Sequence, residues 1–416
     1  MKFIELGLSD SLVSAVEKNG YTESTPIQAQ AIPKILAGKN LLAAAETGTG
    51  KTAAFALPII QKLNNKNQGK YKRIKALVLT PTRELASQVG SNFKKYASHS
   101  NLRIVDVYGG VKISQQIKQL SNGTDILVAT PGRLIDLMNQ NQLDISNIDI
   151  FVLDEADRML DMGFMPDIKR IIKHLPLEKQ TVMFSATFSR EIKKLANSLM
   201  TDAEEISISK SNSSGKNIKQ FVYPVDKSRK QELLTHLIKE KSWYQVLVFS
   251  RTKYGANRIV TRLGKSKISA AAIHGDKSQS QRSKALLDFK KGKLNVLVAT
   301  DIASRGIDIN KLQQVVNFDL PNAPEDYVHR IGRTGRAGES GLAISLVSAD
   351  EIKQLGGIEK LTRNKIEQVF IDGFEPEHNL PEIKIDKKPK FKKKTFFKKK
   401  KKKKSLFEKR NSKAKH

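Results

Sequence analysis

The chain carries two short motifs whose residue types could act on a phosphate group. In the first, residues 41–52, an apolar run ends in a Gly/Thr turn, and Gly50-Lys51-Thr52 then opens a helical pattern. Backbone N–H groups at such a turn converge on an anion, and the helix dipole favours its charge. Lys51 would reach the β- and γ-phosphates of a nucleotide, and the Thr52 hydroxyl would complete a Mg²⁺ shell. The alternative is an ordinary turn with an exposed lysine, because the generic pattern has glycine where this chain has Ala45.

The second motif places three acids directly after another apolar run, residues 150–153. A β-branched, apolar run of this kind predicts a central parallel strand. Carboxylates at the carboxyl end of such a strand lie where open α/β sheets bind ligands. Asp154 would hold Mg²⁺ through water, and Glu155 would orient the water that attacks the γ-phosphate. An acidic helix N-terminus is the alternative, and the phosphate motif upstream favours the magnesium site.

Repeated strand–turn–helix units between residues 75 and 200 predict a mostly parallel sheet that positions these motifs. Apolar runs at 76–80 and 126–130 are followed by Pro81-Thr82-Arg83 and Pro131-Gly132-Arg133, and Gly109-Gly110 ends a third run. Threonine, arginine or bare backbone at a strand end could hold the phosphate oxygens of a second ligand. Ordinary turns between strand and helix are an equal alternative for these segments.

A second unit of the same kind follows a short segment with the composition of a flexible linker, residues 205–218. Apolar runs at 246–250, 296–300 and 314–318 predict buried strands. The tetrapeptide Leu-Val-Ala-Thr ends a strand at 127–130 and again at 297–300. Two similar α/β units are therefore expected. The second contains no phosphate loop, so one nucleotide is expected.

The second unit contains an arginine-rich segment, residues 329–336. Arginines at this spacing in a glycine-containing loop can converge on one anion, and guanidinium groups donate bidentately to phosphate. A basic turn that touches solvent or RNA is the alternative.

The N-terminal segment, residues 3–38, contains groups that could recognise a base. The amide of Gln28 can donate to and accept from an adenine edge at once, and Phe3 or Tyr21 could stack on its face. The alternative is a helix that begins at Pro26 with an exposed glutamine.

Composition points to a polyanionic partner. The chain has 73 Lys and Arg against 42 Asp and Glu, a formal charge of +31. It has no cysteine, which excludes disulfides and thiolate metal sites and is compatible with a reducing cytoplasm. The N-terminus lacks the apolar core of a signal peptide, and no stretch of about twenty apolar residues predicts a membrane span.

Charge is concentrated at the C-terminus. Residues 381–416 contain 17 Lys and one Arg against three acids, a net charge of +15. Like charges at this density predict a tail that does not pack. Interleaved phenylalanines suit stacking on unpaired bases: Phe391, Phe396, Phe397 and Phe407. A solubilising tail and a nuclear-targeting tail are the alternatives.

The Lys51 motif, Asp154-Glu155-Ala156-Asp157 and Ser185-Ala186-Thr187 together resemble the DEAD-box RNA helicases. In that family the phosphate loop normally begins with alanine, which agrees with Ala45. The motifs occur in the family's order over about residues 1–370. The resemblance implies an α/β fold of two tandem RecA-like parallel-sheet domains, ATP and Mg²⁺ as cofactors, and RNA as partner.

The resemblance also implies a role for each matched residue. Catalysis is expected from Lys51, Asp154, Glu155, His329 and the arginine fingers Arg333 and Arg336. Nucleotide contacts are expected from Phe3, Tyr21, Gln28, Thr47, Gly48, Thr49, Gly50, Lys51, Thr52 and Asp308, with Thr52 and Asp154 at the magnesium ion. RNA contacts are expected from Arg83, Gly110, Thr130, Arg133, Arg251, Gly275, Gln279, Arg282 and Thr300. Coupling between the domains is expected from Ser185, Thr187, Asp301, Arg305 and Arg330.

The expected domain boundaries follow from these patterns. Domain one spans 1–208, a linker spans 209–218, domain two spans 219–374, and an RNA-tethering tail spans 375–416. This short layout with a basic tail looks most like the bacterial RhlE-like branch of the family. We expect a cytoplasmic monomer without membrane association, with ribonucleoprotein or RNA-decay proteins as candidate partners.

Neither half contains a complete site, so catalysis is expected to require closure of the two domains. Closure would bend one RNA strand and melt a short duplex locally, with little sequence preference. Two other classes stay open. A DNA-translocating helicase would show ATPase stimulation by DNA, and an RNA clamp or chaperone would bind without turnover.

Overall fold

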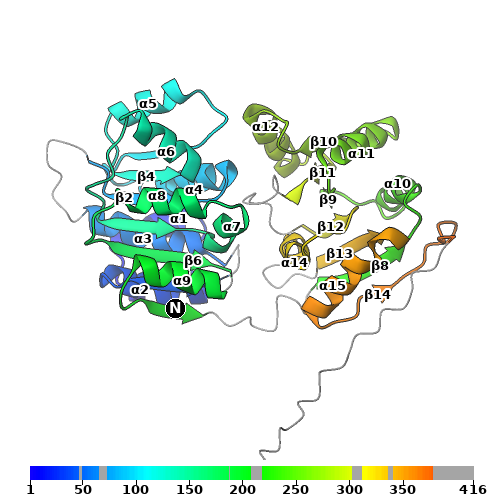
Figure 1. Cartoon of the computed structure of the whole chain (residues 1–416), viewed down its shortest axis with the longest axis horizontal. Coiled ribbons are helices and arrows are strands. Elements are labelled where there is room, and N and C mark those ends of the chain that lie inside the picture. Colours follow the sequence, from blue (N-terminus) through cyan, green and yellow to red (C-terminus); the bar gives the residue numbers. More distant parts are fainter. Residues whose placement is uncertain are drawn as a thin grey trace, which may run out of the picture. The chain divides into compact units, whose positions relative to one another are not determined.

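Two parallel sheets, each flanked by helices, make up the fold (Figure 1). The computed structural model describes residues 1–45, 49–64, 73–186, 188–207, 218–301, 312–335 and 341–377. Every strand pair within either sheet is parallel. In the described part of the chain, no helix has the length and apolar character that crossing a membrane requires.

The first sheet has seven strands in the order β3-β4-β2-β5-β6-β1-β7. Three helical segments precede it, η1 (Phe3–Leu6), α1 (Asp10–Lys18) and α2 (Pro26–Leu36). Strands and helices then alternate: β1 (Leu41–Ala44), α3 (Lys51–Asn64), β2 (Ala76–Leu79), α4 (Arg83–Tyr96), β3 (Ile104–Val107), α5 (Ile113–Ser121), β4 (Ile126–Ala129), α6 (Pro131–Asn139), β5 (Ile150–Leu153), α7 (Ala156–Asp161), α8 (Met165–Ile172), β6 (Gln180–Ser185), α9 (Arg190–Leu199) and β7 (Glu204–Ser207).

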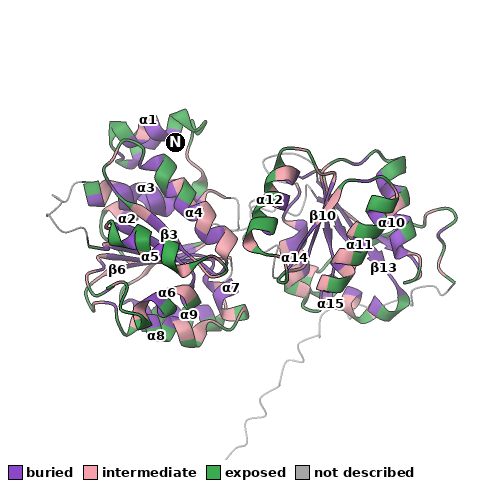
Figure 2. Cartoon of the chain, turned by 90° about the horizontal axis from the view of Figure 1, so that it is seen from above, coloured by how far each residue is buried: buried purple, intermediate pink, exposed green. Residues whose placement is uncertain are grey.

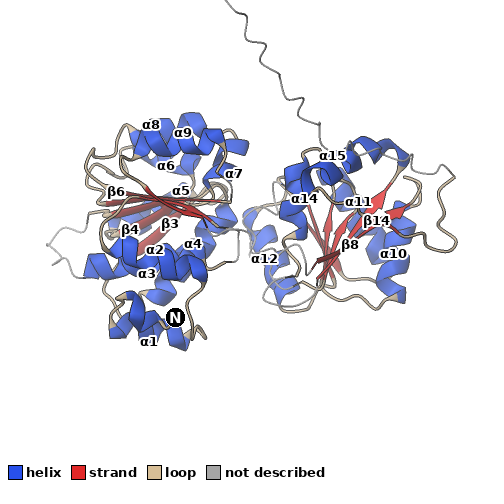
Figure 3. Cartoon of the chain, turned by 90° about the horizontal axis from the view of Figure 1, so that it is seen from below, coloured by secondary structure: helices blue, strands red, loops and turns tan. Residues whose placement is uncertain are grey.

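Alternation along each strand places side chains in two separate cores. In β2, Ala76 and Val78 pack with the helices α2, α3 and α4, whereas Leu77 and Leu79 pack with α6, α8 and α9. The two groups of helices cover opposite faces of the sheet (Figure 3). The strands are consequently buried on both sides, which explains their continuous apolar sequence (Figure 2).

The second sheet also has seven strands, in the order β10-β11-β9-β12-β13-β8-β14. Its elements are β8 (Ile218–Pro224), α10 (Lys230–Glu240), β9 (Val246–Phe249), α11 (Lys253–Lys265), β10 (Ala270–Ile273), α12 (Gln279–Lys290), β11 (Val296–Ala299), β12 (Gln314–Asn317), α14 (Pro324–Ile331), β13 (Gly341–Val347), η2 (Ala349–Glu351), α15 (Ile352–Thr362) and β14 (Glu367–Gln368).

The two sheets have the same strand order, because β8 to β14 take the places of β1 to β7 in turn. The repeated Leu-Val-Ala-Thr tetrapeptide lies on corresponding strands, β4 and β11. The prediction of two tandem parallel-sheet domains is therefore confirmed. The expected linker falls almost entirely on residues 208–217, and most of the expected tail falls on 378–416, both of which lie outside the described residues.

Candidate active site

The candidate phosphate, magnesium and RNA residues of the first domain lie at one edge of its sheet, where the strands end. The segments assigned to phosphate and Mg²⁺ follow β1 and β5, and Ser185, which was assigned to coupling, ends β6, the strand between them. The segments assigned to RNA follow β2, β3 and β4, which form the other part of the same sheet. Parallel strands present their carboxyl ends at a common edge. The two sets of residues therefore lie at the same edge of the sheet but at different strands.

The described end of the phosphate motif, Gly50 and Lys51, leads directly into α3. Gly50 has a φ of +92°, and a Cβ there would lie 2.4 Å from the Nε2 of Gln28, so only glycine fits. Lys51 is the first residue of α3 and is buried. Its Nζ has no hydrogen-bond partner among the described residues. A buried cation that makes no hydrogen bond to any described residue, at a helix N-terminus, fits a site for nucleotide phosphate.

Asp154 also has a buried polar atom that makes no hydrogen bond to the described residues. It lies directly after β5, is buried, and its Oδ1 has no hydrogen-bond partner in the described part of the chain. Burial raises the pKa of Asp154 to about 6, and the positive charge of Lys51 opposes this rise. An unsatisfied, buried carboxylate oxygen fits a site for Mg²⁺, which prefers oxygen ligands, and the half-buried Thr52 in the first turn of α3 offers a hydroxyl.

Glu155 is held in a strained backbone conformation at the N-terminus of α7. Its φ is +54° and its ψ is +51°, the left-handed region that residues with a Cβ rarely adopt. Its side chain is buried, and its Oε2 accepts a hydrogen bond of 2.8 Å from Nη1 of Arg158. The left-handed residue separates β5 from α7, and the ion pair with Arg158 restrains the carboxylate.

Asp157 connects this motif to the segment after β6. Its Oδ2 accepts a hydrogen bond of 2.9 Å from the backbone N–H of Ala186, next to the buried Ser185. The motif at residues 154–157 and the motif at residues 185–187 are therefore joined by a direct hydrogen bond. Thr187, which follows, lies outside the described residues.

Gln28 lies against the phosphate loop with both ends of its amide engaged. Its Oε1 accepts from the backbone N–H of Thr25 at 2.9 Å, and its Nε2 donates to the carbonyl oxygen of Gly50 at 3.1 Å. Recognition of adenine by this amide, which stays a proposal, would exchange these bonds. Of the two expected aromatic rings, Tyr21 is exposed, whereas Phe3 packs in the core. Stacking of either ring on adenine stays a prediction.

In the RNA half of the first sheet edge, Arg83 contacts the turn that follows β3. A Cβ at Gly110, which has a φ of +79°, would lie 1.8 Å from Nη1 of Arg83, so the glycine allows the close approach. Arg133 donates to Oε1 of Gln116 at 2.6 Å and to the carbonyl oxygen of Val111 at 3.2 Å. Its guanidinium therefore braces the same turn. Thr130 is the residue before α6 and is buried.

The second sheet has a corresponding edge. Arg251 follows β9, Gly275 follows β10 and Thr300 follows β11, which are adjacent strands. Gln279 is the first residue of α12, and Arg282 lies in its first turn. The residues expected to contact RNA in the second domain therefore lie at equivalent places to those in the first.

Arg330 and Asp301 form a bidentate ion pair within the second domain. Nε and Nη2 of Arg330 donate to the two carboxylate oxygens of Asp301 at 2.6 and 2.7 Å. Nη1 of Arg330 also donates to Oδ1 of Asn317 and to the carbonyl oxygen of Asp319. His329 lies beside Arg330 on α14, and the buried Arg333 follows that helix.

Several predicted site residues lie outside the described residues, and their roles stay predictions. These are Thr47, Gly48, Thr187, Arg305, Asp308 and Arg336. Thr49 is described and lies in the bend that precedes α3.

Two residues that hydrogen-bond to predicted site residues were not identified from the sequence, Arg158 and Gln116. Arg158 could have been found, because it lies three positions after Glu155 at the start of a helix. Gln116 carried no such signal, since its contact with Arg133 depends on how two separate turns pack.

A parallel α/β sheet with a phosphate loop after its first strand and an acidic residue after a nearby strand defines a nucleotide-hydrolysing domain. Comparisons with known proteins give the family. Residues 25–195 match the model described as DEAD/DEAH box helicase, and residues 229–338 match the helicase conserved C-terminal domain.

Several curated relatives bear the name DEAD-box ATP-dependent RNA helicase CshA, among them proteins from two Bacillus species. The protein from Bacillus cereus is 44% identical over 367 residues, which are 88% of this chain and 69% of the relative. The protein from Bacillus subtilis is 41% identical over 88% of this chain and 74% of its own length.

Solved structures agree with this result. S. cerevisiae Dbp5 bound to RNA and ADP BeF3 is 31% identical with a TM-score of 0.76, over 90% of this chain and 95% of that one. Mss116 bound to ssRNA and UDP-BeF is 28% identical with a TM-score of 0.78, over 89% and 79%. The chain therefore belongs to the DEAD-box ATP-dependent RNA helicases, which are RNA-stimulated ATPases.

Proposed function

We propose that the protein couples ATP hydrolysis in its first domain to local melting or remodelling of RNA bound along both sheet edges. The observation that carries this proposal is the pair of buried, unsatisfied groups in the first domain, Nζ of Lys51 and Oδ1 of Asp154. Buried charged groups without partners are costly, which supports a role in binding a ligand of complementary charge.

Each residue at this edge has a part in the proposed reaction. Lys51 and the backbone N–H groups that follow Gly50 bind the phosphates of ATP. Thr52 and Asp154 hold Mg²⁺, which supplies charge neutralisation at the reacting phosphate. Glu155, oriented by Arg158, positions the attacking water and accepts its proton. Arg333 and Arg336 would donate to the γ-phosphate from the second domain and stabilise the charge that develops there.

The proposed RNA contacts give little sequence preference. Arg83, Gly110, Thr130 and Arg133 offer guanidinium, hydroxyl and backbone groups, which suit phosphate and sugar rather than base edges. The lysine-rich residues 381–416 are proposed to tether RNA near the domains, since their charge of +15 attracts any polyanion.

We infer a role like that of the CshA relatives rather than a place in the RhlE-like branch expected from the short layout. The relatives' shared name supports this choice, because it belongs to proteins that are 41–44% identical to the chain over 88% of its length. Action as a cytoplasmic monomer with ribonucleoprotein or RNA-decay partners is part of the same proposal.

RNA is expected to stimulate the ATPase strongly, and single-stranded DNA of the same sequence is expected to stimulate it little. The 2′-hydroxyl groups of RNA provide the contacts that distinguish the two. ATP turnover at saturating nucleic acid, followed by strand separation of a short RNA duplex, tests this. Lys51→Ala is the negative control, since it removes the cation at the phosphates. Equal stimulation by DNA would indicate a DNA-translocating enzyme, and RNA binding without turnover would indicate a clamp.

ATP is expected to be preferred over GTP, and Gln28→Ala is expected to reduce this preference by about tenfold, the value of one lost hydrogen-bonding side chain. The change removes the amide proposed to read adenine and its bond to Gly50. The measurement is kcat/KM for both nucleotides at saturating RNA. Gln30→Ala, at an exposed position of the same helix, is the matched control. Hydrolysis of GTP at the wild-type rate for ATP would refute the assignment.

A further inference from the structure

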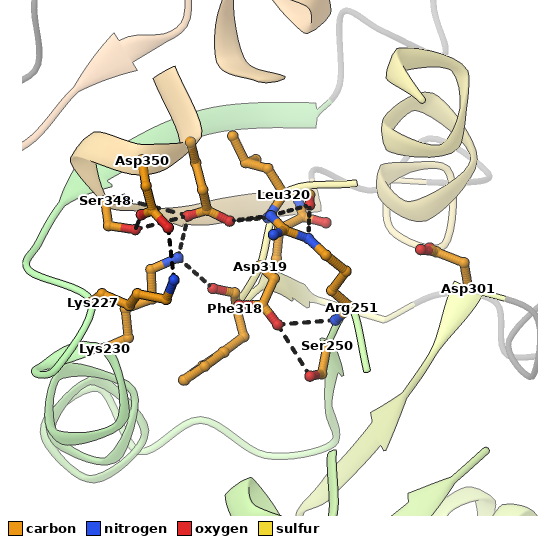
Figure 4. A network of polar contacts seen from close by, with 12 residues as sticks. Lys227, Lys230, Ser250, Arg251, Asp301, Phe318, Asp319, Leu320, Ser348 and Asp350 are labelled. Atoms are coloured by element: carbon orange, nitrogen blue, oxygen red, sulfur yellow. Dashed lines mark hydrogen bonds and ion pairs between the residues drawn. The ribbon is translucent and has the colours of Figure 1, made fainter. Parts of the chain in front are cut away.

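An ion cluster centred on the buried Glu351, the last residue of η2, lies at the carboxyl edge of the second sheet. Figure 4 labels its other members, Lys230, Arg251, Leu320 and Ser348. Oε2 of Glu351 accepts from Nζ of Lys230, on α10, and from the backbone N–H of Ser348 at 3.4 Å. Oε1 accepts from Nη2 of Arg251 at 2.8 Å and from the backbone N–H of Leu320 at 3.0 Å. We call these five residues the Glu351 cluster. Both oxygens of the carboxylate are satisfied, which allows it to remain buried and charged.

Within this cluster the guanidinium of Arg251 is held on one side only. Nε and Nη2 donate to the carbonyl oxygen of Leu320 at 3.3 and 3.1 Å, in addition to the bond from Nη2 to Glu351. Nη1 makes no hydrogen bond to any described residue, and the side chain is 33% exposed. Arg251 therefore has a fixed plane and an accessible pair of N–H groups.

The backbone of Arg251 is fixed as well. Its N–H donates to Oδ2 of Asp319 at 2.9 Å, and the hydroxyl of Ser250 donates to the same oxygen at 3.1 Å. Asp319 and Leu320 follow β12, whereas Arg251 follows β9, so the cluster joins the ends of neighbouring strands (Figure 4). Two segments of the domain, the turn after β12 and η2, thus converge on Arg251.

We infer that Glu351 is a positioning residue for RNA binding, which holds Arg251 so that Nη1 faces a phosphate oxygen of the RNA backbone. This inference rests on the proposed function, in which Arg251 contacts RNA. A free arginine loses rotamer freedom when it binds phosphate, whereas an arginine held in place beforehand loses little. The planar guanidinium suits this role, because one of its edges can donate to Glu351 and Leu320 while Nη1 donates to a phosphate oxygen.

The competing explanation is that the cluster only stabilises the fold. The two explanations differ in whether the effect of Glu351 on RNA depends on Arg251. A positioning residue acts through the arginine, so its contribution disappears when the arginine is removed. A contribution to folding alone would persist in either background.

The experiment is a double-mutant cycle in the full-length protein, with RNA-stimulated ATPase as the readout. Glu351→Gln is expected to raise the KM for RNA about tenfold, the scale of one misplaced charge-assisted hydrogen bond. Its kcat at saturating RNA and its KM for ATP are expected to stay within about twofold of the wild-type values. In the Arg251→Ala background, Glu351→Gln is expected to add no further increase.

Glu359→Gln is the matched control. Glu359 is equally buried and accepts a bond of 3.0 Å from the backbone N–H of Ile366, so the substitution perturbs a buried carboxylate away from Arg251. Thermal unfolding of each variant separates stability from RNA binding. If Glu351→Gln does not fold because Lys230 loses its counter-ion, Glu351→Asp replaces it. That variant keeps the negative charge in the cluster but shortens the side chain by one methylene, so the carboxylate no longer reaches Nη2 of Arg251 in the same geometry, and it must show the same rise in KM.

Two results would overturn the inference. One is a KM for RNA in the Glu351 variant equal to that of the Glu359→Gln control. The other is an equal rise in KM whether or not Arg251 is present. A wild-type protein without RNA stimulation would instead contradict the proposed function itself, so the two failures are distinguishable.

Discussion

Glu155→Gln is expected to lower kcat for ATP hydrolysis by about 10²- to 10⁴-fold, the usual contribution of a general base. The amide can still accept the bond that Nη1 of Arg158 donates to this side chain, so the strained turn is expected to keep its shape. What the variant loses is the ability to take a proton from water. Asp154 and Lys51 are unchanged, and the affinities for ATP and RNA are therefore expected to be retained.

Single-turnover hydrolysis and equilibrium binding of a fluorescent ATP analogue separate these effects. Glu191→Gln is a suitable control, because it makes the same chemical change at an exposed position in the first turn of α9. Turnover near the wild-type rate would show that another group positions the water.

Arg333→Ala is expected to slow hydrolysis by about 10³-fold, the lower range for an arginine finger. In the proposed closed state its guanidinium would neutralise charge that develops on the γ-phosphate, and the methyl group of alanine cannot. Binding of ATP is expected to change little, since the nucleotide residues of the first domain are intact.

The measurement is kcat at saturating ATP and RNA, with Arg258→Ala as the control. Arg258 is exposed on α11, so its substitution removes one positive charge from the same domain without touching the edge where the strands end. If the two variants have similar kcat values, Arg333 does not act on the phosphate.

Much of the candidate site could be predicted because its residues directly follow strands, and each strand is recognisable in the sequence as a short apolar run. Lys51 and Asp154 each come directly after a buried apolar run, and the parallel sheet then places both runs at one edge. Both side chains are buried, and neither Nζ of Lys51 nor Oδ1 of Asp154 has a hydrogen-bond partner in the described part of the chain, which agrees with what the motifs imply.

What could not be predicted depends on contacts between distant segments. The sequence indicates that Arg251 carries charge at a strand end, but Glu351 lies 100 positions later and belongs to no motif. Gln28 is similar, because its bond to Gly50 follows from how α2 packs beside the phosphate loop. Such pairings are decided by tertiary packing, which local patterns do not encode.

The shared strand order of the two sheets has a consequence for nucleotide stoichiometry. Since β8, β12 and β13 stand at the places of β1, β5 and β6, the Glu351 cluster occupies the part of the second sheet that corresponds to the ATP site of the first. The turn after β8 has no glycine, and Lys230 donates to the protein's own carboxylate instead of to a phosphate. The carboxylate of Glu351 therefore lies where the first domain has its phosphate motif, and we expect the second domain to bind no nucleotide. The expected stoichiometry is one ATP per chain, with the second domain contributing contacts to RNA.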